Sequence, residues 1–159
     1  MENVEYLNNL INDCQKAKNA VLDEQYVLKK EMDINDIKKI KSGIYIIREL
    51  NGDSDKTSES FINFKNENKD LKCPKFNGIP SETLYVGSST TGLLKRLKQH
   101  IEQCHKDTYA LRLNDWFTGE YEIEIRVYHG IERNVLQLIE DNLAFNLSPA
   151  FGKRGSNNK

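Results

Sequence analysis

The sequence predicts one α/β domain, because strand-like segments and amphipathic helical segments follow one another along a chain of single-domain length. Strands are indicated by a β-branched and aromatic run at 43–48, a similar run at 83–87, and strict apolar/polar alternation at 121–128. Apolar residues recur at helical spacing in 93–101 and 132–146. A chain of 159 residues can build one hydrophobic core but hardly two.

Composition indicates a globular protein of a reducing compartment. The chain is 38% hydrophobic and 30% charged, and no apolar run approaches the about 20 residues that cross a bilayer. Acidic residues stand at the N-terminus where a secretory signal would be basic. Three scattered cysteines without a Cys-x-x-Cys pair indicate neither a disulfide framework nor a zinc knuckle. We therefore expect a cytoplasmic protein that makes no membrane contact.

The first 41 residues are predicted to form a helical arm that packs on the domain. Apolar residues recur near helical spacing at Leu7, Leu10, Ile11, Cys14, Ala17 and Val21. Asp33 or Asn35-Asp36 offers N-cap chemistry for a shorter helix at 37–40. An arm that dimerises or that clamps DNA is the alternative interpretation.

Between the first two strands, residues 51–82 are mostly polar and rich in turn-forming residues. They are predicted to form a long inserted loop, far longer than an ordinary hairpin connection. The second strand ends at Gly87, where the missing Cβ permits a sharp turn and a close approach of another group. Thr90 or Thr91 is then expected to cap the helix at 93–101.

In that helix, the core face is expected to hold Leu94, Leu97 and Ile101. Arg96 and His100 stand four residues apart and therefore lie side by side on a neighbouring face. A short helix is expected at 107–117, with its leucines, Trp116 and Phe117 in the core.

The alternation at 121–128 predicts that Glu122 and Glu124 face solvent. In the helix at 132–146, Glu140 stands at the edge of the apolar face, where a carboxylate can look into a cleft. Residues 151–159 are predicted to be a basic, flexible tail that can close over a polyanion.

Charge is unevenly distributed although the net charge is only −1, which argues against non-specific coating of nucleic acid. Residues 84–114 contain five basic and two acidic side chains, whereas residues 115–140 contain two and six. The helix after Tyr85 and the tail are therefore the surfaces expected to contact phosphates. The candidate substrate-binding residues are Gly87, Ser88, Ser89, Lys95, Lys98, Lys153, Arg154 and Asn157.

Taken in order along residues 42–150, these residues resemble the GIY-YIG nuclease family. The resemblance is carried by Gly43-Ile44-Tyr45, Tyr85-Val86-Gly87, Arg96, His100, Glu140 and Pro149. It implies a small three-stranded, mainly antiparallel sheet flanked by helices. Three features depart from the family pattern: Val86 replaces isoleucine, Ser88-Ser89 stands where many members have a lysine or another residue followed by threonine, and Phe151-Gly152 takes the place of a family asparagine. Asn157 or Asn158 is the candidate replacement for that asparagine.

The resemblance also implies roles for five catalytic residues. Glu140 would bind one divalent cation, Mg²⁺ or Mn²⁺, and Arg96 would hold the scissile phosphate. Tyr45 would orient or deprotonate the attacking water, with Tyr85 and His100 fixing it by hydrogen bonds. Which of these three takes the proton stays open. Taken alone, the two tyrosines are typical of packing within strands. Arg96 and His100 alone are typical of a surface pair, and Glu140 of a surface salt bridge.

The expected function is that of a metal-dependent DNA endonuclease of the restriction or defence, repair or mobile-element type. The alternative is a catalytically weak or inactive nucleic-acid-binding or interaction module that retains the nuclease fold. DNA is the expected partner, and the sequence is compatible with a monomer or a homodimer.

Overall fold

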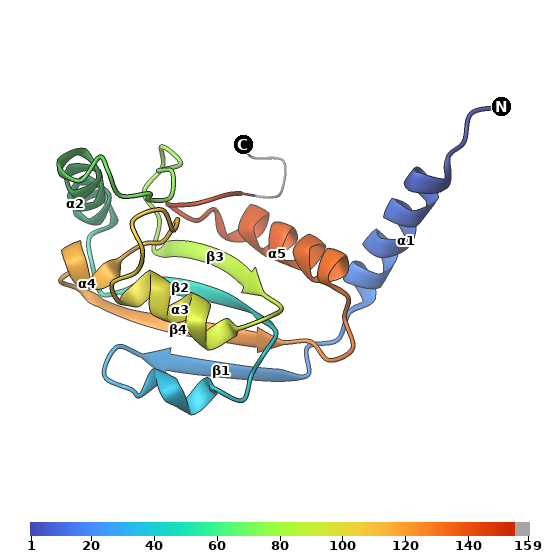
Figure 1. Ribbon diagram of the computed structural model, residues 1–159, viewed down its shortest axis with the longest axis horizontal. Helices are drawn as coiled ribbons and strands as arrows, with labels where there is room; N and C mark the ends of the chain where they lie inside the picture. The colour runs from blue at the N-terminus through green and yellow to red at the C-terminus, as the bar shows by residue number, and fades with distance from the viewer. Residues whose placement is uncertain (155–159) are drawn as a thin grey trace.

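The computed structural model describes residues 1–154, which form a four-stranded antiparallel sheet in the order β1-β4-β2-β3, flanked by helices (Figure 1). The predicted α/β character is confirmed, but the expected count of three strands is wrong. The strands are β1 (Glu24–Lys29), β2 (Gly43–Leu50), β3 (Thr83–Ser89) and β4 (Glu120–Val127). The helical elements are α1 (Glu5–Asn19), the 3₁₀ turn η1 (Ile34–Ile37), α2 (Ser54–Glu67), α3 (Leu93–Ile101), α4 (Leu113–Trp116) and α5 (Arg133–Leu147).

The additional strand, β1, comes from the segment expected to be a helical arm. It pairs antiparallel with β4, so that Leu28 lies opposite Ile123 and is buried. Without β1, β4 would expose a row of unpaired backbone groups at the edge of the sheet. Local spacing cannot register this tertiary pairing, so the sequence did not predict the strand. Asp33 does act as an N-cap, but for the earlier turn η1, because its Oδ1 accepts the backbone N–H of Asn35 at 2.8 Å.

The expected loop at 51–82 contains a full helix, α2. The Asp53 side chain caps it by accepting the backbone N–H groups of Asp55 and Lys56. Phe61 is fully buried and anchors this otherwise polar helix against the domain. Tertiary contacts, with Phe61 the largest buried side chain, therefore stabilise a helix that shows little periodicity in the sequence.

The two faces of the sheet build two cores. Tyr45 and Ile47 of β2 face the side covered by α2, α3 and α4, where Phe61, Leu93, Leu97 and Leu113 are buried. Ile44 and Ile46 face α5 and pack with Val86, Val135, Leu136 and Ile139. Strand alternation thus separates Tyr45 from Ile44 and Ile46.

Glu124 corrects a sequence prediction, because it is buried and does not face solvent. It is only 6% exposed, and its carboxylate accepts hydrogen bonds from Arg48 Nη1 at 2.6 Å and Arg126 Nε at 2.5 Å. Gln25 Nε2 of the added strand β1 donates a third at 2.9 Å. Neighbouring strands therefore surround a carboxylate that would be open to water on a smaller sheet. Glu122 is half-buried.

The beginning of the expected flexible tail is anchored. Residues 150–152 run between the start of β3 and the 75–77 segment, with backbone hydrogen bonds to both. Phe151 is fully buried, and its ring centroid lies 4.2 Å from that of Phe61. These contacts hold the backbone of residues 150–152 in place immediately before Lys153.

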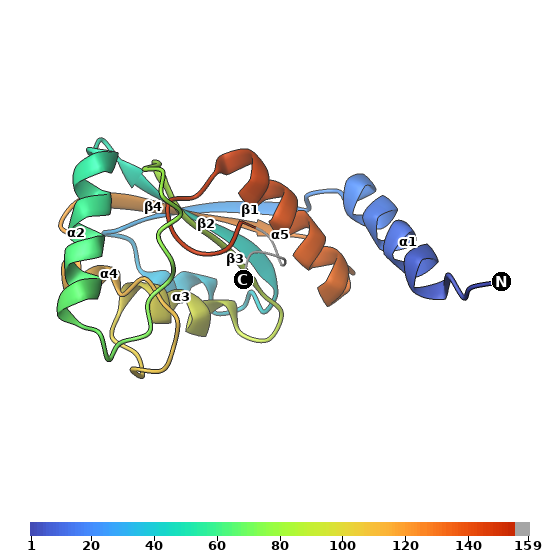
Figure 2. The same ribbon diagram turned by 90° about the horizontal axis from the view of Figure 1, so that it is seen from above.

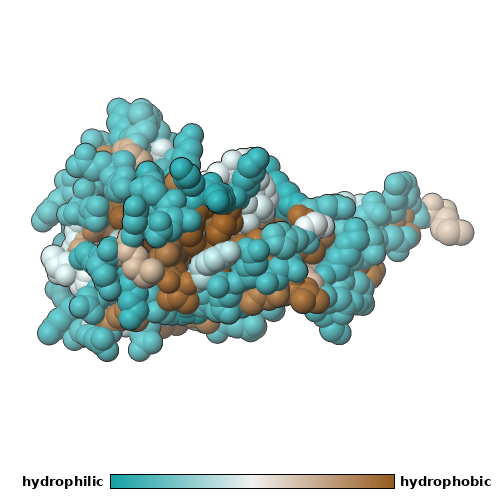
Figure 3. All heavy atoms as spheres, turned by 90° about the horizontal axis from the view of Figure 1, so that it is seen from below, coloured by the Kyte–Doolittle hydropathy of each residue, from teal (hydrophilic) through white to brown (hydrophobic). Residues whose placement is uncertain are grey.

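Helix α1 projects from the body, at the end of the molecule opposite α2 (Figures 1 and 2). None of its residues is buried, and its polar contacts with the α5 end are an Asn134–Asp13 hydrogen bond and a Lys16–Glu132 pair at 3.8 Å. Apolar surface is visible on the body and along the projecting helix (Figure 3). None of the helices within residues 1–154 combines the length and apolar character that a membrane crossing needs.

Candidate active site

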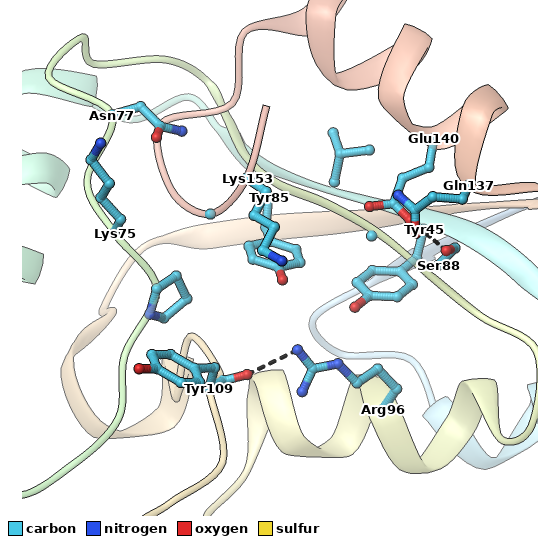
Figure 4. A pocket seen from close by; sticks show the side chains of 14 residues that line it. Tyr45, Lys75, Asn77, Tyr85, Ser88, Arg96, Tyr109, Gln137, Glu140 and Lys153 are labelled. Carbon is cyan, nitrogen blue, oxygen red and sulfur yellow. Dashed lines mark hydrogen bonds between the residues drawn. The ribbon is translucent and has the colours of Figure 1, made fainter. Parts of the chain in front are cut away.

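A cleft of about 660 Å³ opens beside the edge strand β3 (Figure 4). Four of the five candidate catalytic residues line it: Tyr45 of β2, Tyr85 of β3, Arg96 of α3 and Glu140 of α5. The fifth, His100, lies behind Tyr45 and is fully buried. Residues that are 95 positions apart in the chain therefore meet around one hollow.

Each tyrosine lies over a glycine. Tyr45 is paired across the strands with Gly87, and a methyl group added there would lie 2.6 Å from Cζ of Tyr45. A methyl group on Gly152, whose φ is +91°, would lie 3.0 Å from Cδ2 of Tyr85. The two tyrosine rings stack with an interplanar angle of 10° and centroids 6.1 Å apart. Both glycines are therefore required by close approach, and Gly152 also by its backbone conformation.

The hydrogen bonds of His100 determine which ring nitrogen carries its proton. Nδ1 accepts the backbone N–H of Leu111 at 3.2 Å, so this nitrogen is not protonated. Burial, with the charge of Arg96 nearby, holds the pKa of His100 well below its usual value and keeps the ring neutral. The proton is therefore on Nε2, which donates to the Tyr45 hydroxyl oxygen at 2.9 Å. His100 has no free lone pair with which to act as a base toward the cleft.

Both tyrosines are protonated at neutral pH. Burial raises the pKa of Tyr45 well above its usual value, and the neighbouring Tyr85 raises it further, while Arg96 acts in the opposite direction. Burial likewise raises the pKa of Tyr85, again opposed by Arg96. Since the Tyr45 oxygen accepts the hydrogen bond from His100 Nε2, its own O–H is free to donate into the cleft.

Arg96 brings a permanent positive charge to the wall of the cleft. Its guanidinium donates from Nη1 to Gln99 Oε1 and from Nη2 to the carbonyl oxygen of Tyr109, each at 2.9 Å. In Figure 4 it faces the hydroxyl ends of Tyr45 and Tyr85. These bonds hold the charge at one wall of the cleft without neutralising it.

Glu140 reaches the cleft from the opposite face of the sheet. Its Oε2 accepts a hydrogen bond from the Ser88 hydroxyl, and Ser88 lies next to Gly87 on β3. Burial raises the pKa of Glu140, while the Ser88 hydrogen bond acts to lower it. Since β3 is an edge strand, side chains from both faces of the sheet can meet at its rim. Ser88, one of the departures from the family pattern, thereby contacts the carboxylate directly.

The donor set around Glu140 decides what metal could be held. Within residues 1–154, no cluster of three or more His, Cys, Asp or Glu side chains is arranged to hold an ion. A closed structural metal site therefore does not fit. A single carboxylate at an open cleft does fit Mg²⁺, which keeps several waters and takes the rest of its ligands from a substrate phosphate.

Other predicted binding residues divide between the cleft and its surroundings. Gly87, Ser88 and Lys153 line the cleft. Ser89 lines a neighbouring hollow of about 250 Å³ together with Thr90, Thr91 and Arg133. Lys95 is exposed on α3 and Lys98 lies near Asp33, and neither lines the cleft. Arg154 follows Lys153 in the chain and is half-buried. Asn157 and Asn158 lie outside the described residues.

Several polar and aromatic cleft residues were given no site role from the sequence. Lys75, Asn77, Tyr109 and Gln137 also line it. Gln137 stands three residues before Glu140 on the same helix, so helical spacing would have found it. Tyr109 was expected within a helix, but 107–112 is irregular, with Arg112 at φ +55° and its guanidinium donating to the carbonyl oxygens of Cys104, His105 and Thr108.

Comparison with protein-family models, with curated proteins and with solved structures finds no match to this chain. Function is therefore inferred from the geometry of the cleft and from the motif resemblance.

Proposed function

We propose that the protein is a divalent-cation-dependent DNA endonuclease that hydrolyses phosphodiester bonds, and that it is related to the GIY-YIG nucleases. One observation carries the proposal: Tyr45, Tyr85, Arg96 and Glu140 converge on one cleft. Phosphodiester hydrolysis needs a positioned water, charge stabilisation on the phosphoryl oxygens and support for the leaving oxygen. The cleft offers a group suited to each task.

The cation at the wall suits phosphate binding. The guanidinium of Arg96 is planar and permanently charged, and it can contact two oxygens of one phosphate. Its hydrogen bonds to Gln99 and Tyr109 fix the orientation before substrate arrives. Such preorganisation reduces the free energy that would otherwise be spent on positioning the charge during the reaction.

Tyr45 is assigned the positioning of the water. Its hydroxyl oxygen accepts the hydrogen bond from His100 Nε2, so its own O–H is left to donate to a group in the cleft. A protonated tyrosine is a poor base, and removal of its proton would need Arg96 or a metal charge nearby. When bound at Glu140, Mg²⁺ or Mn²⁺ would supply the Lewis acidity that stabilises negative charge on the phosphate.

One observation favours the second candidate, a nucleic-acid-binding module without turnover. Both terminal nitrogens of Arg96 already donate hydrogen bonds within the protein. A guanidinium held in this way can bind a phosphate only through its remaining donors or after it exchanges a partner. Turnover, and not binding, therefore distinguishes the two candidates.

The experiment is incubation with supercoiled, linear, single-stranded and branched DNA in the presence of Mg²⁺ or Mn²⁺ and, separately, EDTA. Wild type and Lys56→Ala, an exposed α2 variant outside the cleft, are expected to cut at the same rate. Glu140→Ala and Arg96→Ala are expected to lose at least about 100-fold in rate, the loss typical of removing a transition-state charge partner. If wild type binds these DNAs but leaves them intact in both metals, the binding module is correct.

A further inference from the structure

The end of the cleft away from Glu140 contains an aromatic side chain that no core uses. Tyr109 is 59% exposed, although its neighbours Ala110 and Leu111 are fully buried. In Figure 4, Tyr109 and Lys75 lie opposite Glu140 and Ser88, with Lys153 between the two ends. An aromatic ring that stays largely exposed next to buried neighbours does little for packing.

The position of Tyr109 is nevertheless well defined. Its carbonyl oxygen accepts the hydrogen bond from Arg96 Nη2, and the carbonyl of Thr108 accepts one at 3.1 Å from the Arg112 guanidinium. The Lys72 ammonium lies 5.6 Å from the centre of its ring. The ring is thus presented to the cleft by a fixed backbone, with a cation beside it.

Phosphate chemistry does not explain the composition of this end. Pro74, Tyr85 and Tyr109 give the cleft apolar surface, whereas a phosphate needs only cations and hydrogen-bond donors. The flat apolar part of a nucleic acid is its base, which stacks on aromatic rings in proteins that bind single strands. In a duplex the bases are stacked on each other, so that no base face is free for Tyr109.

We propose that Tyr109 stacks on a nucleobase next to the scissile phosphate, and that the preferred substrate is therefore DNA with an unpaired nucleotide at the cleavage position. This inference depends on the proposed function and specifies its substrate class. Lys75 and Lys153 then contact the phosphates on either side of that nucleotide. A cleft of about 660 Å³ lies in the size range of sites that enclose a small ligand group.

The test measures the binding of a labelled oligothymidylate by fluorescence anisotropy, in EDTA so that no cleavage occurs. Tyr109→Ala is expected to weaken binding by about tenfold, while Tyr109→Phe keeps it within about twofold, because stacking needs the ring and not the hydroxyl. Tyr6→Ala removes an exposed tyrosine on α1 and is expected to bind like wild type. With an abasic oligonucleotide, Tyr109→Ala and wild type should bind equally.

Three results would overturn the inference. Tyr109→Ala binds as tightly as wild type, or Tyr109→Phe is as weak as Tyr109→Ala, or a blunt duplex competes as well as the single strand. Cleavage of single-stranded DNA by wild type, measured beside these assays, separates failure of the stacking site from failure of the proposed nuclease function. If wild type cuts but Tyr109→Ala binds and cuts normally, only the stacking site fails; if wild type neither binds nor cuts, the proposed function fails with it.

Discussion

The hydroxyl oxygen of Tyr45 lies 2.9 Å from Nε2 of His100, and the other ring nitrogen of His100 accepts the backbone N–H of Leu111. The sheet, α3 and the 110–112 segment are thereby connected through one neutral imidazole. Since both nitrogens are engaged, His100 positions Tyr45 and does not itself exchange protons with a substrate.

Acidification should therefore destabilise the protein through His100. An unfolded histidine binds a proton below about pH 6.5, whereas the pKa of folded His100 is held well below that value, so the unfolded state binds more protons. Stability from this residue is complete above about pH 6.5 and is lost as the pH falls, by up to about 1.4 kcal/mol per pH unit.

The measurement is the free energy of unfolding of wild type and His100→Gln between about pH 7.5 and about pH 5. The variant is less stable at neutral pH, but the difference between the two proteins should narrow on acidification. A constant difference across this range would show that His100 is not held neutral in the folded protein.

Gly87→Ala should damage catalysis more than stability. The added methyl group would lie 2.6 Å from Cζ of Tyr45, so the ring must move away from its hydrogen bond with His100. Overpacking of this kind costs about 1–3 kcal/mol, and a shift of about 1 Å in a catalytic group costs about 100-fold in rate. Gly92→Ala, where the nearest atom is 3.7 Å away, is the matched control. Equal rates for both variants would mean that the Tyr45 position does not limit the reaction.

Glu140→Gln should abolish cleavage without lowering stability. Burial raises the pKa of Glu140, so over the range between its unfolded and folded pKa the folded state binds more protons, and stability falls as the pH rises. At neutral pH the ionised carboxylate therefore costs stability that glutamine, which still accepts the Ser88 hydrogen bond, does not.

Thermal unfolding checks this expectation. At neutral pH, the Tm of Glu140→Gln should be equal to that of wild type or up to about 2 °C higher. This difference in Tm should disappear in acid, where Glu140 is protonated. Cleavage by wild type should decline over the same acid range. A variant that unfolds well below wild type would instead assign Glu140 a structural role.

The buried carboxylate of Glu124 should contribute to stability and not to activity. Glu124→Ala leaves Arg48 and Arg126 without their shared partner. The free energy of unfolding is therefore expected to fall by about 2 kcal/mol. Glu120→Ala, exposed at the start of the same strand, should change it by less than about 0.5 kcal/mol. Equal effects would mean that the arginines are adequately solvated without Glu124.

The parts of the fold with strong local periodicity were predictable from sequence. β2, β3, β4, α3 and α5 lie where the β-branched runs, the alternation and the helical spacing place them. So does Glu140, at a cleft. These features follow from short-range patterns that the tertiary structure only reinforces.

The parts that were not predicted depend on long-range contacts. β1 pairs with an edge of β4 nearly a hundred residues away, and its Gln25 joins Arg48 and Arg126 around the buried carboxylate of Glu124. Phe151 is core because the segment after Pro149 adds to the start of β3. Tyr109 reaches the cleft because Arg112 holds an irregular loop, which no local periodicity encodes.

The most direct test of the proposed active site is a double-mutant cycle on single-turnover DNA cleavage with Tyr45→Phe, Glu140→Gln and the double variant. Residues that act as one hydrolytic unit are strongly non-additive. The predicted result is a large rate loss in each single variant and a double variant no more than about tenfold slower than the slower single variant. Wild-type rates in either single variant, or losses that simply multiply in the double variant, would contradict a shared active site.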